Sequence, residues 1–169
     1  ANGSAVGEAL LNAVERCDNP EDSYAGAYLE LFLRYNPDVN YRRGIVLQRA
    51  TQHADINLIK RLLPGATSDS KSMAFPYLFK SSCEESSMLQ MIEDFSEPAD
   101  EGQNLDLGFR HPDPAIEPVL FMALRVFPRK TQVLKALLEA GANPDQCMPF
   151  EVDPDIGPEP CTGLFWTIY

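Results

Sequence analysis

Near its C-terminal end the chain carries a short stripe of apolar residues at helical spacing. In residues 130–145 (KTQVLKALLEAGANPD), four apolar residues occupy positions i, i+1, i+4 and i+5, namely Val133, Leu134, Leu137 and Leu138. This spacing places them on one side of an α-helix with 3.6 residues per turn. We expect Thr131 to cap the start of this helix and Gly141 to end it in the left-handed conformation. A helix this short cannot bury its stripe alone, so neighbouring helices of similar design are expected.

Copies of this stripe occur earlier in the chain. They begin at Tyr28 and Leu58, and a weaker copy begins at Met88. The first two copies lie 30 residues apart, and the weaker copy divides the interval of 75 residues between Leu58 and Val133. Repeats of about 30 residues with two helices each are typical of stacked solenoids. The pattern therefore predicts an array of stacked helix pairs.

Several segments resemble parts of the ankyrin repeat, whose inner helix opens T-P-L-H-x-A-A and whose outer helix ends L-L-x-x-G-A-x-x-N. Residues 137–143 (LLEAGAN) are similar to the outer-helix ending. Residues 117–123 (EPVLFMA) are similar to the inner helix, with Pro118 at its opening position. Residues 75–79 (FPYLF) and 162–166 (TGLFW) resemble further inner helices, although no unit contains T-P-L-H as such. The resemblance covers roughly the whole chain.

The ankyrin resemblance implies an all-α fold, a helical-repeat solenoid of about four helix pairs plus a partial fifth, with long loops between the later repeats. We expect residues 1–169 to form a single domain. Its units are, by residue number, 5–40, 41–69, 70–96, 117–145 and a partial unit 161–169, with insertions 97–116 and 146–160. The last residues (LFWTIY) resemble an inner helix without its outer partner, so we expect a fragment of a longer array.

The apolar pattern also predicts the individual helices and turns. Inner helices are expected at 7–16, 45–53, 76–82 and 117–123, and the first three outer helices at 24–35, 54–63 and 84–95. Residues 41–44 (YRRG) are expected to form the tip of a finger between units, and residues 67–72 (TSDSKS) a polar turn. Residues 146–160 (QCMPFEVDPDIGPEP) are predicted to be an expanded finger stiffened by proline.

Residues 96–116 form the longest interruption of the array. Within them Leu105, Leu107 and Phe109 alternate with polar neighbours, so this segment is expected either to form a small hairpin or to pack back on the groove. Long insertions in compact arrays are usually functional or disordered. We expect this one to determine specificity, the alternative being an insertion that is merely tolerated.

Charge and composition narrow the classes of function. The net charge is −11, and phosphate binding needs a compensating positive face, so no nucleic-acid partner is expected. The sequence contains no apolar run long enough to span a membrane and no visible signal peptide. We therefore predict an intracellular protein, cytoplasmic or nuclear, with no membrane partner, which as an isolated fragment is a monomer.

The cysteines and acidic residues give no persuasive metal or cofactor site. The four cysteines are far apart, and without a secretory signal they are expected to be free thiols: Cys17, Cys83, Cys147 and Cys161. Zinc needs four ligands, and a cluster of Cys147, Cys161 and His111 is the alternative. A calcium loop starting at Glu151 fails, because Ile156 replaces the required glycine and Thr162 the bidentate glutamate. We predict no metal and no cofactor.

Two classes of function remain. The ankyrin resemblance implies a non-catalytic protein–protein interaction module, a scaffold that binds a protein or peptide partner through its concave face and finger loops. A narrower version is a sensor or autoinhibitory segment of a multidomain intracellular receptor. The other class is an enzyme in which Cys83 or Cys147 is the nucleophile and His111 its partner.

The sequence favours the interaction module over the enzyme. It contains no G-x-S-x-G, no H-E-x-x-H and no phosphate-binding glycine loop. We expect the partner-binding residues on three finger loops: Tyr41, Arg42, Arg43, Asp106, Phe109, Arg110, His111, Phe150 and Glu151.

Overall fold

The computed structural model describes residues 3–17, 24–35, 37–81, 83–97, 104–151 and 158–163, and for residues 3–4 and 150–151 it describes the backbone alone. The described elements follow one another as α1 (Gly3–Cys17), α2 (Ala25–Leu33), α3 (Tyr41–Gln52), α4 (Ile56–Leu62), the 3₁₀ helix η1 (Leu63–Gly65), α5 (Ser68–Ala74), the 3₁₀ helix η2 (Phe75–Phe79), α6 (Glu85–Ser96), α7 (Val119–Val126), α8 (Thr131–Glu139), β1 (Cys147–Glu151) and β2 (Pro158–Thr162). The chain is mostly helical, which confirms the predicted all-α class.

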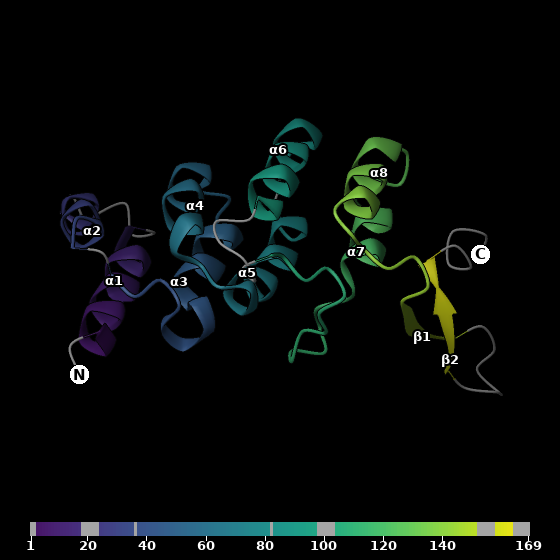
Figure 1. Cartoon of the computed structure of the whole chain (residues 1–169), viewed down its shortest axis with the longest axis horizontal. Helices are drawn as coiled ribbons and strands as arrows, with labels where there is room; N and C mark the ends of the chain where they lie inside the picture. Colours follow the sequence, from purple (N-terminus) through teal and green to yellow (C-terminus); the bar gives the residue numbers. More distant parts are fainter. Residues whose placement is uncertain are drawn as a thin grey trace.

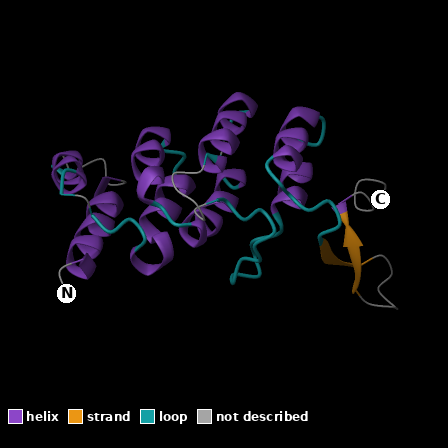
Figure 2. Ribbon diagram, in the orientation of Figure 1, coloured by secondary structure: helices purple, strands orange, loops and turns teal. Residues whose placement is uncertain are grey.

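The helices lie in two rows that follow the chain from its N-terminal to its C-terminal end (Figure 1). One row contains α1, α3, α5 and α7, and the other contains α2, α4, α6 and α8. Contacts join α1 to α2 and α3, α3 to α4 and α5, and α8 to α6 and α7. The loop before α7 and the two-stranded sheet extend on the side of the α1–α7 row (Figure 2).

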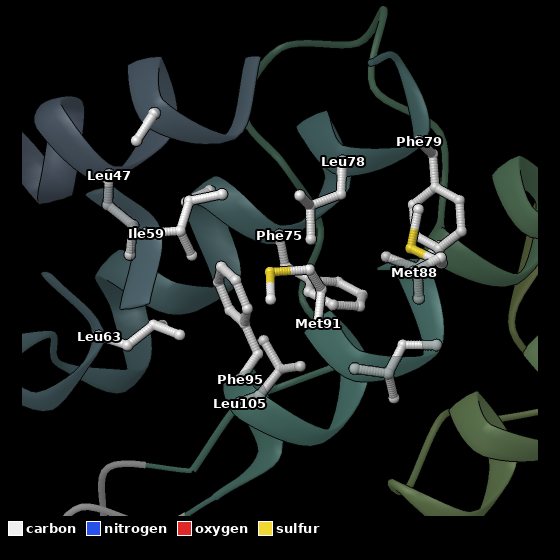
Figure 3. Close-up of a cluster of buried hydrophobic side chains, with 14 of the residues drawn as sticks. Leu47, Ile59, Leu63, Phe75, Leu78, Phe79, Met88, Met91, Phe95 and Leu105 are labelled. Carbon is white, nitrogen blue, oxygen red and sulfur yellow. The ribbon is translucent and has the colours of Figure 1, made fainter. Parts of the chain in front are cut away.

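One hydrophobic cluster runs through the array, from Leu10 of α1 to Leu137 of α8. Figure 3 shows its middle part, where α3, α4, η1, η2, α6 and the loop after α6 all contribute side chains: Leu47, Ile59, Leu63, Phe75, Leu78, Phe79, Met88, Met91, Phe95 and Leu105. Each short helix therefore buries its apolar stripe against its neighbours rather than around a separate centre.

Most predicted helices are confirmed. Those predicted at 24–35, 54–63 and 84–95 are α2, α4 and α6, with ends shifted by no more than two residues. Those predicted at 7–16 and 45–53 are α1, which starts four residues earlier, and α3, whose first residues are a left-handed turn through Gly44, so that its regular helix begins at Ile45 as predicted. Apolar spacing locates these helices well because each contributes a stripe to the same core.

Two predicted helix boundaries have the expected geometry. Pro118 is the residue before α7, in an extended conformation that leaves its missing N–H outside the helical hydrogen bonds. Gly141 follows α8 with φ +98°, and the next residue, Ala142, donates its backbone N–H to the carbonyl of Leu137 at 2.9 Å. Because a left-handed residue lets the chain fold back on the last helical carbonyls, glycine marks the end of α8.

The start of α8 and one part of its stripe differ from the prediction. The N-cap residue is Lys130, and it makes no side-chain capping bond, so the prediction that Thr131 caps the helix is wrong. Val133 and Leu137 are fully buried, but Leu138 is 46% exposed. Among the described elements α6 and α7 make the main contacts with α8, and they leave Leu138 uncovered, so the apolar stripe is wider than the surface that covers it.

Residues 67–72, predicted to be a polar turn, form the start of α5 instead. Thr67 accepts a hydrogen bond from the backbone N–H of Ser70 at 3.4 Å and so caps the helix. The inner helix predicted at 76–82 has the wrong bounds, because it begins with α5 and ends with η2 at Phe79, so that Pro76 lies inside it. Polar composition was misleading here, since three polar residues of α5 are buried: Ser70, Lys71 and Ser72.

Two of these buried groups hold the flanks of the long insertion. The Nζ of Lys71 donates to the backbone carbonyl of Glu97 at 3.2 Å, where α6 ends. The Oγ of Ser72 accepts from the backbone N–H of Asp106 at 3.0 Å. Helix α5 therefore fixes both ends of the segment between α6 and residue 106, which explains why its polar side chains lie inside the array.

Lys71 gives a test of this burial. Only 1% of it is exposed, and burial lowers the pKa of its amine, although the charge of Glu97 opposes this. Lys71→Met keeps the aliphatic stem and removes the buried charge, so we expect its free energy of unfolding at pH 7 to equal or exceed that of the wild type. Lys71→Ala also removes the stem and is expected to destabilise the fold.

The pH dependence of stability should separate charge from packing. The folded amine loses its proton at a lower pH than the unfolded amine, whose ordinary pKa is 10.5. The free energy of unfolding of the wild type therefore rises with pH up to that value. The difference in this free energy between Lys71→Met and the wild type becomes smaller over the same range. Denaturant unfolding from pH 7 to 10.5 measures both curves, and a methionine variant less stable than wild type at pH 7 contradicts the prediction.

Strands β1 and β2 pair as an antiparallel hairpin where an expanded finger was predicted. In their register Met148 lies opposite Cys161 and Pro149 lies opposite Pro160. Residues 161 and 162 therefore belong to a strand, which the prediction of a partial helical unit from 161 missed, and Gly163 directly after it is helical. The rest of the predicted partial unit, residues 164–169, lies outside the described residues. Strand pairing between distant residues leaves little local signal in an acidic, proline-rich stretch.

Candidate functional site

The first finger is a left-handed turn at the start of α3. Its φ angles are +48°, +59° and +73° at Arg42, Arg43 and Gly44. Its side chains bind neighbouring helices rather than pointing freely to solvent. Tyr41 donates its hydroxyl to Glu8 of α1, Arg42 pairs with the same carboxylate at 3.3 Å, and Arg43 forms two hydrogen bonds to Asp69, of 2.7 and 2.9 Å. The hydrogen bond from Arg43 lowers the pKa of Asp69.

Ion pairs of the same kind connect other neighbouring helices. They join α1 to α3, α2 to α4, α4 to α6, and α6 to the start of α8: Glu15–Arg49, Glu30–Arg61, Asp94–Lys60 and Glu85–Lys130. Exposed pairs of this kind stabilise a fold only slightly, but they favour one register between adjacent helices. The predicted binding residues of the first finger belong to this set of internal contacts.

The insertion packs back on the array, which is one of the two predicted alternatives. Leu105 and Leu107 are buried in the common core, and residues 104–118 contain no strand. Asp106, a predicted binding residue, accepts a hydrogen bond from the N–H of Gly108 at 2.9 Å and so shapes its own turn. Gln146 donates to the carbonyl of Gly108 at 3.4 Å, which ties this turn to the base of the hairpin.

An aromatic cluster follows this turn. The ring of His111 lies edge-on to Tyr77 of η2 and to Phe109, with centroids 5.6 and 6.4 Å apart. The guanidinium of Arg43 lies 5.9 Å from the centroid of the Phe109 ring, so the first finger reaches the insertion. Three predicted site residues are thus brought together, although Arg43 lies far in the sequence from Phe109 and His111.

Beside this cluster is a cavity of about 340 Å³ between the insertion and β1. Its walls are mainly apolar, with one charged residue of each sign: Phe109, Arg110, His111, Pro114, Ile116, Glu117, Pro118, Cys147, Met148 and Pro149. The size and the apolar lining fit the usual properties of a ligand pocket. Sequence analysis identified Phe109, Arg110 and His111 but missed the β1 residues, because their proximity depends on the hairpin.

His111 contributes an unused hydrogen-bond donor to this cavity-lining set. Its Nδ1 accepts a hydrogen bond from the backbone N–H of Asp113 at 3.1 Å, so in the neutral ring the proton is on Nε2. Nε2 is buried and has no hydrogen-bond partner among the described residues. Burial lowers the pKa of His111, with smaller opposing effects from Asp113, so the ring is neutral at pH 7.

Two cations near His111 have no ion-pair partner among the described residues. Arg110 lines the cavity and is exposed, and no described carboxylate lies within salt-bridge distance of it. Lys80 is exposed as well and is close enough to His111 to oppose its protonation. Glu117, the acidic residue of the cavity lining, is paired with Arg125 at 2.8 Å. Asp113 also lies near His111, so positive and negative side chains are mixed here, and Arg110 is the cation of the cavity wall without a described ion-pair partner.

The hairpin cannot easily accept a further strand. Because proline has no N–H, Pro149 and Pro160 must form a non-hydrogen-bonded pair, in which the backbone nitrogens and carbonyls of both residues point away from the partner strand. Pro158 belongs to the same type of pair, opposite Glu151. At these three prolines an added strand would find no donor. Recognition at β1 therefore depends on side chains.

Cys83, Cys147 and Cys161 are free thiols, and among the described residues no base is placed to activate them. Burial raises the pKa of Cys83 and of Cys161, which disfavours their thiolates. Cys147 lines the cavity with His111, and its thiol lies 3.3 Å from the carbonyl of Asp145. Since Nδ1 of His111 is occupied and Nε2 carries the proton, this histidine does not accept the thiol proton in the observed arrangement.

The remaining predicted site residues are Phe150 and Glu151. Their backbone belongs to β1, and their side chains lie outside the described part of the structure. Where side chains are described, no three histidine, cysteine or acidic residues come together as metal ligands would. No helix in the described ranges is long and apolar enough to cross a membrane.

Comparison with known proteins gives no relative from which a function could be transferred. No family model, no curated protein and no solved structure matches the chain.

Proposed function

We propose that the chain is an ankyrin-like helical-repeat solenoid and acts as a non-catalytic, intracellular protein–protein interaction module. The two rows of short helices, their shared core and the left-handed glycine after α8 support the ankyrin-like part of this proposal. The free thiols support an intracellular location. A sensor or autoinhibitory segment of a larger receptor would use the same kind of surface, and that version stays a prediction.

The observation that carries the proposal is the cavity between the insertion and β1. It combines apolar walls with two groups that have no partner among the described residues, the guanidinium of Arg110 and a buried donor on His111. Interaction surfaces concentrate such groups, since an aromatic or arginine anchor in a pocket contributes most of the binding energy. The first finger contributes indirectly, because Arg43 packs on Phe109.

Site-specific photo-crosslinking tests this function. We expect a benzoylphenylalanine at position 114, an exposed residue of the cavity lining, to give a discrete adduct with one protein in an extract of the native source. The matched control is position 135 on α8, where the lysine is also exposed and makes only a local pair with Glu139. Adducts at both positions, or at neither, would contradict an interaction surface at the cavity.

A further inference from the structure

We propose that this cavity binds an acidic segment of a partner protein, with one large apolar side chain inside the cavity and a neighbouring carboxylate on Arg110. The inference rests on the proposed function and specifies its ligand. The apolar side chain of the ligand is inferred from the walls of the cavity, which contain Phe109, Ile116 and Met148 together with prolines. Such walls gain most by excluding water around an apolar group.

The acidic part follows from charge. Arg110 has no acidic partner among the described residues, although the chain has 25 acidic and 14 basic residues. The two carboxylates closest to it in sequence each accept a backbone N–H of their own turn, Asp113 from Ala115 and Asp106 from Gly108, and Glu117 pairs with Arg125. A guanidinium binds a carboxylate through two parallel hydrogen bonds, so an incoming acidic side chain satisfies Arg110.

A second group calls for an acceptor on the ligand. The buried Nε2–H of His111 has no partner among the described residues, and leaving such a donor unpaired is unfavourable. Nε2 is closed to solvent in the unbound chain, so a backbone carbonyl of the bound segment satisfies it where binding moves the side chains that cover it. The prolines of the hairpin leave few donors for strand addition. The segment is therefore held by its side chains and this single backbone contact, which separates it from a peptide that extends a sheet.

A random-peptide phage library selected on the purified chain provides the ligand for the test. We expect enriched peptides to carry Asp or Glu within two residues of a large aliphatic or aromatic residue. Affinities of one synthetic enriched peptide are then measured by fluorescence polarisation. Arg110→Glu is expected to weaken binding about tenfold, the loss of a charge-assisted pair. His111→Phe, which keeps an aromatic ring, is expected to weaken it about fivefold without lowering Tm.

The matched control is Arg129→Glu, because Arg129 is an exposed arginine in the α7–α8 loop, outside the cavity. At physiological salt it is expected to change affinity less than twofold. Equal effects of the two arginine variants, or enriched peptides without acidic residues, would overturn the inference. If peptides without acidic residues bind and position 114 still crosslinks a partner, the interaction module stands and only its ligand class is wrong. If no peptide binds and no partner is crosslinked, both this inference and the proposed function fail.

Discussion

Phe75→Ala is expected to lower the free energy of unfolding by about 3–5 kcal/mol. Phe75 is 1% exposed at the junction of α5 and η2. Its ring lies edge-on to Phe79 and Phe95, with centroids 5.8 and 5.3 Å apart, and so connects η2 to α6 (Figure 3). Removing it leaves a cavity at the centre of the array, where units on both sides depend on the same contacts. Guanidinium unfolding followed by circular dichroism measures the loss.

The matched control for this prediction is Tyr35→Ala. Tyr35 is 72% exposed just after α2, and its removal is expected to change stability by no more than about 0.5 kcal/mol. If Phe75→Ala were as mild as Tyr35→Ala, the aromatic cluster would not hold η2 and α6 together. A loss of cooperativity in Phe75→Ala is also informative, because it would show that the two halves of the array can unfold separately.

Gly44→Ala is expected to destabilise the chain by about 2–4 kcal/mol, for two additive reasons. Gly44 has φ +73°, which strains any residue with a Cβ. A Cβ there would also lie 2.6 Å from the Cβ of Ser70, where α3 and α5 come together. Thermal unfolding and denaturant titration give the change in stability, and the first finger should lose its contacts before the core does.

Two other glycines separate these causes. Gly141 has φ +98° but no atom within 4 Å of an added Cβ, so Gly141→Ala should cost only the conformational part, about 1–2 kcal/mol. Gly26 lies in α2 with open space around it, so Gly26→Ala should be neutral or stabilise by about 0.5 kcal/mol. If Gly44→Ala cost no more than Gly141→Ala, close packing of α3 on α5 would be refuted.

The candidate site could be predicted only in part. The length and apolar alternation of the insertion directed attention to Phe109, Arg110 and His111, which do line one cavity. The sequence could not show that the first finger is occupied by Glu8 and Asp69, since those partners come from other helices. Nor could it show that Cys147 to Pro149 complete the cavity, because strand pairing decides where they lie.

The sequence by itself determined those structural features whose cause lies within a few neighbouring residues. Apolar residues at helical spacing located six of the helices, and Gly141 and Pro118 marked ends where backbone geometry restricts the residue type. The tertiary structure decided the rest. The polar stretch at 67–72 belongs to a partly buried helix, because Lys71 and Ser72 form hydrogen bonds with backbone groups of the insertion. Burial of a polar group depends on distant atoms that satisfy it, and no local pattern specifies them.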